Sequence, residues 1–251
     1  MEMDPKLTAA VVSLLTNFIT RGDLGPGKTL GDIWDIVLGN YFHALNDKSK
    51  IKHQVQIDDF KNKLAEDILK IAKEKLQDPR MSIVGPALEA SKYYFDEKEI
   101  RDMFVKLIAS SMDSTYNGLV QHSFVEIIKQ LSPHDAKLFK SFQDMEPYVS
   151  LIDVYDNGSN KTLVDRMYIS SSFDDYKINE ISIDNLIRLG FIKLEEESHL
   201  TKDSLYEHYS KFGILASVLK TYDNNKFCVK KYFVITAFGK AFKKVCIKDS
   251  L

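Results

Sequence analysis

Cysteine and excess charge are both scarce in this chain. Its 251 residues include two cysteines, Cys228 and Cys246, which lie far apart and have no metal-ligand spacing. A disulfide framework is therefore not indicated, and a reducing cytoplasm is the expected compartment. Lysine and arginine number 34 against 36 aspartate and glutamate, so the formal net charge is -2. This balance excludes a global attraction to nucleic acid or to an anionic membrane, and any such binding must be local.

Long hydrophobic runs are also missing. The apolar run at residues 7–19 is interrupted by Ser13, Thr16 and Asn17, and it is shorter than the about 20 apolar residues that a membrane-spanning helix needs. The first residues, MEMDP, lack the basic segment of a signal peptide. We expect no spanning helix and no export signal. The 44% hydrophobic and 28% charged composition is that of a globular protein with one large or two modest domains.

Helical periodicity dominates residues 1–78. Asp4-Pro5 predicts a first helix, and apolar residues recur at helical spacing again in residues 30–45 and 57–76. Asp78-Pro79 ends the last of these segments, because proline disfavours helix in the residue before it. We therefore predict a helical N-terminal region that ends at residue 78.

A phosphate-binding motif is matched letter for letter between the first two of these helices. The segment GDLGPGKT follows the pattern G-x-x-x-x-G-K-[ST]. The residues before it have helical rather than strand periodicity, and Pro26 has no N–H to donate to a phosphate. We favour a connecting loop followed by a capping box of Thr29 and Asp32, and we expect no cofactor. A nucleotide site is the less favoured alternative, and its residues would be Gly22, Gly27, Lys28 and Thr29.

The central region, residues 79–131, has the clearest helix signals. A short helix is predicted at residues 82–94, with Pro86 close to its start. A long amphipathic helix follows and ends near Met112. Helix starts are predicted by residue pairs with N-terminal capping patterns, at Asp96/Glu99, Ser123/Glu126 and Ser132/Pro133.

No set of residues in the sequence has the spacing of a catalytic or metal site. His122, His134 and Asp135 are close in the chain, yet no serine or cysteine nucleophile can be placed beside them. Asp135 already fits the first turn of a helix. His199 and His208 lack a recognised metal-ligand spacing. We therefore expect neither catalytic residues nor a bound metal.

Strand patterns appear in the last third of the chain. Residues 149–154 and 227–235 are rich in β-branched residues, and Asn157-Gly158 and Asn224-Asn225 are turn signals. The fold class changes here from mainly α to α+β.

The order of elements after Pro133 is similar to that of a winged helix. A short helix at residues 183–189, a strand at 190–195, a second strand and a final helix from Thr236 follow one another, with a helical insertion at residues 202–222. We predict one domain at residues 79–251. It consists of a helical part, residues 79–131, and a winged-helix-like part, residues 132–251.

A basic stretch near the C-terminus favours a contact with nucleic acid. Lysine recurs between residues 220 and 248, where Asp223 is the single acidic residue. The candidate recognition helix argues against this contact, because Glu180 and Asp184 would face phosphates and only Arg188 is basic. We rank nucleic acid below a protein partner or a second copy of the chain. The lysines of the alternative contact are Lys230, Lys231, Lys240, Lys243 and Lys244.

An ordered series of motifs resembles the abortive-infection alpha family. VGPALEASKYYFDEKEIRDMFVKLIASSMD is followed by HSFVEIIKQLSPHDAKLF and later by NLIRLGFI and ITAFGKAFKKVC, so the similarity covers about residues 79–250. The family typically has proline after the motif histidine, where this chain has Ser123. The residues that carry the resemblance are Pro86, Asp96, Glu99, Met112, Asp113, His122, Phe124, Leu131, Ser132, Pro133, Leu189, Gly190 and Gly239.

The resemblance implies a bacterial or prophage-encoded protein of defence against phage, and it supplies no established catalytic residues. Together with the residue patterns, it leads us to expect a non-enzymatic, cytoplasmic phage-defence protein. Such a protein would act through protein–protein recognition or self-association. A nucleic-acid-binding regulator or effector that uses the C-terminal lysines is the alternative.

Overall fold

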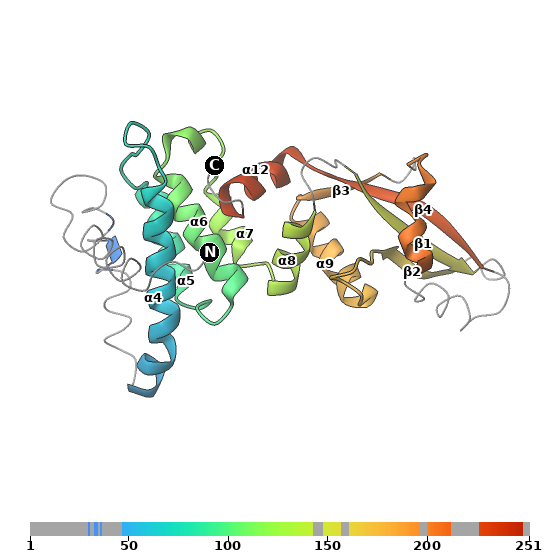
Figure 1. The fold of residues 1–251 in the computed structure, drawn as a ribbon, viewed down its shortest axis with the longest axis horizontal. Helices are drawn as coiled ribbons and strands as arrows, with labels where there is room; N and C mark the ends of the chain where they lie inside the picture. The colour runs from blue at the N-terminus through green and yellow to red at the C-terminus, as the bar shows by residue number, and fades with distance from the viewer. Residues whose placement is uncertain are drawn as a thin grey trace, which may run out of the picture. The chain divides into compact units, whose positions relative to one another are not determined.

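The computed structural model describes residues 30, 33–34, 36, 47–142, 148–156, 161–195, 200–211 and 226–247 (Figure 1). The chain divides into two compact units. The first comprises residues 1–133 and 241–251, and the second comprises residues 134–240. The predicted division at residue 78 stays a prediction.

The described part of the first unit is helical and is built around one buried helix. It contains α4 (Asp47–Leu69), α5 (Met81–Ser91), α6 (Lys98–Ser111), the short 3-10 helix η2 (Ser114–Tyr116) and α7 (Ser123–Ile128). Helices α4, α5 and α7 pack against α6 (Figure 1). Most residues of α6 are buried, and nearly all of the buried ones are apolar or small. The predicted helices at residues 82–94 and from Asp96 onward are thereby confirmed as elements.

The end of α4 corrects one prediction. The helix runs from Asp47 to Leu69, whereas the pattern predicted residues 57–76. Its last turn tightens, since the N–H of Ile71 bonds to the carbonyl of Ile68 at 3.1 Å. The chain then pairs with the segment after α6: the N–H of Gln77 donates to Met112 at 2.9 Å. A tertiary backbone pairing therefore replaces the last turns that the apolar spacing predicted.

Two of the predicted caps are displaced. Helix α6 begins at Lys98 with Glu97 at the N-cap position, and α7 begins at Ser123 with His122 before it. Neither N-cap residue makes a side-chain capping bond. The predicted N-cap Ser123 is thus wrong by one residue, and the predicted N-cap Asp96 lies one residue before the N-cap position of α6, although both helices exist. The third prediction is confirmed, because α8 (Pro133–Ser141) begins at Pro133.

The second unit combines helices with one antiparallel sheet. Its strands are β1 (Tyr148–Asp156), β2 (Lys161–Met167), β3 (Ile192–Glu195) and β4 (Lys226–Ile235), in the spatial order β2-β1-β4-β3. Strand β1 pairs along its whole length with β4, from Tyr148 opposite Val234 to Asp156 opposite Lys226. The predicted strands at residues 149–154, 190–195 and 227–235 are therefore confirmed.

Strand β2 was missed by the sequence patterns. Its residues, KTLVDRM, do not alternate strictly, and the pairing of β1 with β2 contains two register shifts. Arg166 has a positive φ of 49°, which turns the strand locally. Val164 and Met167 are the buried residues of this strand. An irregular edge strand with so few buried residues gives little periodic signal.

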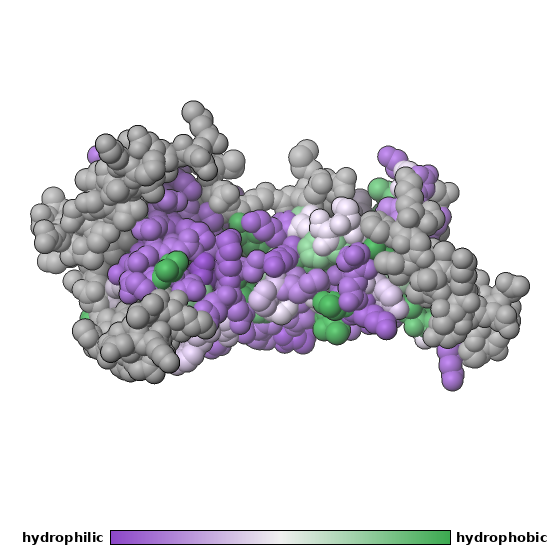
Figure 2. All heavy atoms as spheres, turned by 60° about the horizontal axis from the view of Figure 1, so that its bottom comes forward, coloured by the Kyte–Doolittle hydropathy of each residue, from purple (hydrophilic) through white to green (hydrophobic). Residues whose placement is uncertain are grey.

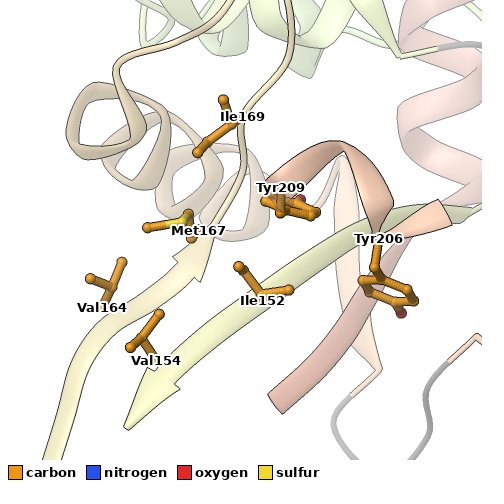
Figure 3. Packing of buried hydrophobic residues seen from close by; sticks show 7 residues of the cluster. All are labelled: Ile152, Val154, Val164, Met167, Ile169, Tyr206 and Tyr209. Carbon is orange, nitrogen blue, oxygen red and sulfur yellow. The ribbon is translucent and has the colours of Figure 1, made fainter. Parts of the chain in front are cut away.

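One face of the sheet is covered by the segment that joins β3 to β4. Tyr206 and Tyr209 pack on residues of β1 and β2 (Figure 3). Tyr206 lies in the turn between the 3-10 helix η3 (Asp203–Leu205) and α10 (Glu207–Lys211), and Tyr209 lies in α10. The Tyr209 hydroxyl donates to the carbonyl of Ser150 at 2.6 Å, and the Tyr206 hydroxyl donates to that of Lys231 at 3.0 Å. The predicted insertion is therefore helical in part, and residues 212–222 lie outside the described residues.

Helices α8, α9 (Tyr176–Arg188) and α12 (Ala237–Cys246) complete the described elements. Helix α9 is longer than the predicted residues 183–189, and the hairpin of β1 and β2 precedes it in the chain. The fold is thus a mixture of helix and strand with an antiparallel sheet near the C-terminus. Within the described ranges, no helix is long and apolar enough to cross a membrane.

Candidate recognition surface

Helix α9 begins at a capping aspartate that the sequence analysis did not identify. The Asp175 carboxylate accepts hydrogen bonds from the backbone N–H groups of Lys177, at 3.0 Å, and Ile178, at 3.4 Å. These donors belong to the first turn, which has no partner within the helix. The cap places the helix start seven residues ahead of the prediction. The sequence could have predicted this start, because Asp175 directly precedes a segment in which apolar residues recur at helical spacing.

Helix α9 ends in a glycine turn that accounts for part of the family motif. The N–H of Phe191 donates to Leu186 and that of Gly190 donates to Ile187, both at 2.9 Å, which is the Schellman arrangement. Gly190 has a φ of +75°, a left-handed conformation that glycine adopts readily. The Leu189-Gly190 motif is therefore the C-terminal stop of α9.

The inner side of α9 is held against α8 by polar contacts. The amide nitrogen of Asn179 donates to the carbonyls of Tyr168, at 2.8 Å, and Phe173, at 3.0 Å. Its oxygen therefore faces Nε2 of His134 at 2.9 Å, so Nε2 carries the hydrogen. Asn185 donates to the Asp135 carboxylate at 2.9 Å. His134 and Asp135 thus have structural roles at the N-terminus of α8.

The outward side of α9 presents two isoleucines among charged residues. The exposed fraction is 69% for Ile181 and 46% for Ile178. Lys177, Asp184 and Arg188 are also exposed and lie on this side, since residues three, four and seven apart share a helix face. Figure 2 shows one face of the molecule as largely hydrophilic with a few separate hydrophobic spots. We call the set of five residues Lys177, Ile178, Ile181, Asp184 and Arg188 the α9 face.

Carboxylates surround the base of the α9 face. Arg166 on β2 forms ion pairs with Asp165 at 2.6 Å and with Asp184 at 3.1 Å. Burial, followed by repulsion from Asp165 and Asp184, raises the pKa of Glu180 above its usual value. The pKa of Asp165 is also raised, first by burial and then by the charge of Asp153. Several carboxylates and the Arg166 guanidinium therefore lie together beside the α9 face.

Lys231 is partly buried and pairs with a fully buried carboxylate. Asp153 on β1 is fully buried, and its carboxylate lies 2.5 Å from the Lys231 ammonium. The same carboxylate accepts from the backbone N–H of Arg166 at 2.8 Å and from the Tyr155 hydroxyl at 3.2 Å. Burial by itself lowers the pKa of Lys231, but the bond and the attraction to Asp153 outweigh it and leave the pKa raised.

The other lysines of the alternative nucleic-acid contact lie in different surroundings. Lys230 lies over the Tyr206 ring, 5.3 Å from its centroid, and Lys244 lies 5.7 Å from that of Tyr116. Lys243 is buried, with 4% exposure, whereas Lys240 is exposed. Lys230 and Lys231 are neighbours on β4 and so point to opposite faces of the sheet.

Several family-motif residues of the first unit have structural contacts. Met112 is fully buried at the end of α6, and the Asp113 carboxylate caps η2 by accepting from the N–H of Thr115 at 2.8 Å. Nε2 of His122 lies 3.0 Å from the Ser82 hydroxyl.

Other motif residues of this unit contribute to packing or to helix starts. The Phe124 ring meets the Phe242 ring edge to face at 5.1 Å between centroids. Pro86 is exposed inside α5, Glu99 is in the first turn of α6, Leu131 is buried, and Ser132 precedes Pro133 at the start of α8.

Gly239 of the motif is explained by a close backbone approach. A Cβ at this position would lie 2.2 Å from the carbonyl oxygen of Phe191. That carbonyl accepts from the N–H of Thr236 at 3.0 Å, so it is fixed in place. The start of α12 can therefore lie against the chain after α9 only if residue 239 has no side chain.

The remaining predicted sites stay predictions. Gly22, Gly27, Lys28 and Thr29 of the phosphate-binding pattern lie outside the described residues. In the part of the chain that the structure describes, no group of three or more histidine, cysteine, aspartate or glutamate residues is arranged to hold a metal ion. Cys228 is exposed and Cys246 is buried, and both are free thiols.

The chain belongs to the abortive infection alpha family. The family model matches residues 52–246, from within α4 to the end of α12. The match thus begins earlier than the motifs predicted, and it includes most of α4. Comparison with curated proteins and with solved structures gave no significant match.

Proposed function

We propose that this protein is a cytoplasmic phage-defence protein of bacterial or prophage origin that recognises another protein through the α9 face and catalyses no reaction. The α9 face carries the proposal. Exposed isoleucines flanked by both signs of charge are typical of a protein-binding surface, because the apolar groups gain by burial and the charges orient the partner. Membership of the abortive infection alpha family supports the defence role.

The order of elements supports the interpretation of the second unit as winged-helix-like. Helices α8 and α9 are followed by β3, β4 and the start of α12, with the β1–β2 hairpin between the two helices and the inserted helices between the two strands. In this reading α9 takes the position of the recognition helix. Its outward residues favour a protein partner, since a helix that reads DNA presents basic and amide side chains to phosphates and bases.

A phage challenge of bacteria that carry the protein tests this proposal. Replacing both exposed isoleucines, Ile178→Ser with Ile181→Ser, should abolish protection while the purified protein keeps its thermal unfolding midpoint. Met81→Ser removes an apolar side chain of 57% exposure from α5 and serves as the matched control. Full protection by the double variant would show that the α9 face is not needed for defence and would contradict the proposal.

A second measurement tests the non-enzymatic part. Purified protein is incubated with nucleotides, DNA and RNA, with and without extract of phage-infected cells, and products are followed over time. We expect no turnover above that of a heat-denatured sample. Robust turnover that a single substitution abolishes would contradict the proposal.

A further inference from the structure

We infer that the α9 face binds the α9 face of a second copy of this chain, with the two helices antiparallel about a two-fold axis near Ile181. The inference rests on the proposed function and names its partner. It follows from the order of Lys177 and Asp184 along the helix, which pairs unlike charges in the antiparallel orientation and like charges in the parallel one.

The α9 face has its apolar centre between opposite charges. Lys177 lies one turn before Ile181, and Asp184 lies one turn after it on the same side of the helix. Arg188 follows one turn further on. Ile181 is the most exposed apolar residue of α9, with 69% of its surface accessible.

A two-fold axis through this centre pairs unlike charges. In an antiparallel arrangement, Ile181 meets Ile181 of the second copy, and Lys177 of each copy meets Asp184 of the other. Arg188 comes to the N-terminal end of the second α9, where Asp174 is exposed. A two-fold contact uses the same residues on both copies, so every attraction occurs twice.

The parallel arrangement is excluded by the same residues. It would place Lys177 against Lys177 and Asp184 against Asp184, and like charges in contact oppose association by several kcal/mol. The orientation of the pair therefore follows from charge, and the attraction follows from burial of Ile178 and Ile181.

Asp184 can serve both its own chain and a second copy. One of its oxygens pairs with Arg166 at 3.1 Å, yet its side chain keeps 51% exposure. A carboxylate accepts several hydrogen bonds, so a lysine from another molecule can reach its exposed side. Asp184 is thereby positioned by the chain before association.

The expected dimer is reversible. A contact between a single pair of helices buries less surface than the roughly 1,200 Å² that stable complexes bury. Association should therefore depend on protein concentration and weaken as salt screens the charge pairs.

Charge-reversal variants and their mixture test the inference in sedimentation velocity. We expect the full-length parent protein to sediment increasingly as a dimer with rising concentration. Lys177→Glu places carboxylates against Asp184, and Asp184→Lys places ammonium groups against Lys177, so each should weaken self-association by about tenfold or more.

An equal mixture of these two variants should associate again. In the mixed pair, the carboxylate introduced by Lys177→Glu faces the ammonium introduced by Asp184→Lys, while the original Asp184 and Lys177 meet on the other side. Lys140→Glu makes the same charge change at an exposed position of α8 and serves as the matched control. Thermal unfolding of every variant verifies that it is folded.

The outcomes separate this inference from the proposed function. A parent protein that stays monomeric, a mixture that does not recover, or an equal effect of Lys140→Glu overturns the dimer. If the parent is monomeric and the isoleucine variant still loses protection, a different protein is the partner. If the dimer is confirmed and the isoleucine variant protects fully, the dimer stands and the proposed role of the α9 face in defence fails.

Discussion

Gly239 shows how one residue can decide whether two segments meet. Its missing side chain leaves room for the Phe191 carbonyl, which accepts the N–H of Thr236 at 3.0 Å. Gly190 contributes in another way, through its left-handed conformation at the end of α9. The two motif glycines thus act on the same junction, one by space and the other by backbone freedom.

Gly239→Ala should destabilise the protein by about 1–3 kcal/mol or more, because a Cβ 2.2 Å from a carbonyl oxygen forces a backbone shift. Gly85→Ala is the matched control: nothing lies within 4 Å of a Cβ there, and alanine stabilises a helix interior by about 0.5–1 kcal/mol. Chemical denaturation of both variants measures the difference. Equal stability of the two variants would contradict the explanation.

Glu180→Gln should stabilise the protein slightly at neutral pH. Burial and the neighbouring carboxylates raise the pKa of Glu180, so the folded state opposes its ionisation. The stability linked to this group is fully present below the unfolded pKa of about 4.3 and is lost as pH rises through the folded value. Removing the charge should thus raise the unfolding midpoint at pH 7 and leave it unchanged at pH 3.

The effect should stay below about 1 kcal/mol, because the site is partly solvated. Glu74→Gln, at an exposed position, provides the comparison. Thermal unfolding at both pH values measures the effect. A gain at pH 3 as large as that at pH 7 would exclude an electrostatic origin.

At the level of elements, helix existence followed from apolar spacing, whereas helix ends depended on tertiary partners. Helix α4 ends at Leu69 because the following backbone pairs beside Met112. Helix α9 begins earlier than predicted because Asp175 caps it. Helix α12 begins where Thr236 predicted, since its hydroxyl accepts from the N–H of Gly239 at 2.9 Å.

Thr236→Val should weaken the start of α12 by about 1 kcal/mol, the usual effect of losing an N-cap. The substitution keeps the volume but removes the oxygen that caps the helix and also donates to Gly190 at 2.6 Å. Thr236→Ser keeps that oxygen and should retain most of the stability. Denaturant unfolding compares the two, and a loss as large for serine as for valine would show that the methyl group matters instead.

At the level of the whole molecule, near-neutral charge and engaged lysines leave little attraction for nucleic acid. The net charge is -2, Lys231 is paired with buried Asp153, and Lys243 is itself buried. We therefore keep the proposal that the α9 face binds a protein. The alternative contact is reduced to exposed residues such as Lys240 and Lys244.

Binding to duplex DNA should therefore be undetectable at about 150 mM salt, where few phosphate contacts give little counterion release. At lower salt, the weak electrostatic binding that remains should fall only slightly with Lys240→Ala and Lys244→Ala together. Fluorescence anisotropy over a salt series measures both. Tight binding at physiological salt that this pair of substitutions removes would favour the nucleic-acid alternative over the α9 face.

The sequence by itself determined the family, the helices α5, α6, α7 and α8, and the strands β1, β3 and β4. Apolar periodicity and short motifs are local properties, so they are readable without a fold. The Leu189-Gly190 and Gly239 motifs were found in the same way. The structural roles of these glycines were not predicted. Strand β2 was missed because its irregular edge position gives no clear alternation.

The tertiary structure alone decided which side chains face outward and which charges are already paired. In the sequence, nothing distinguishes Asp153 from the other carboxylates. In the folded sheet, its carboxylate lies 2.5 Å from the Lys231 ammonium. The sequence did not distinguish Ile178 and Ile181 from the other apolar residues of this segment. In the structure Ile183 and Leu186 are buried, whereas Ile178 and Ile181 are exposed. Burial and pairing join residues that are distant in the chain, and for that physical reason only the folded protein reveals the α9 face.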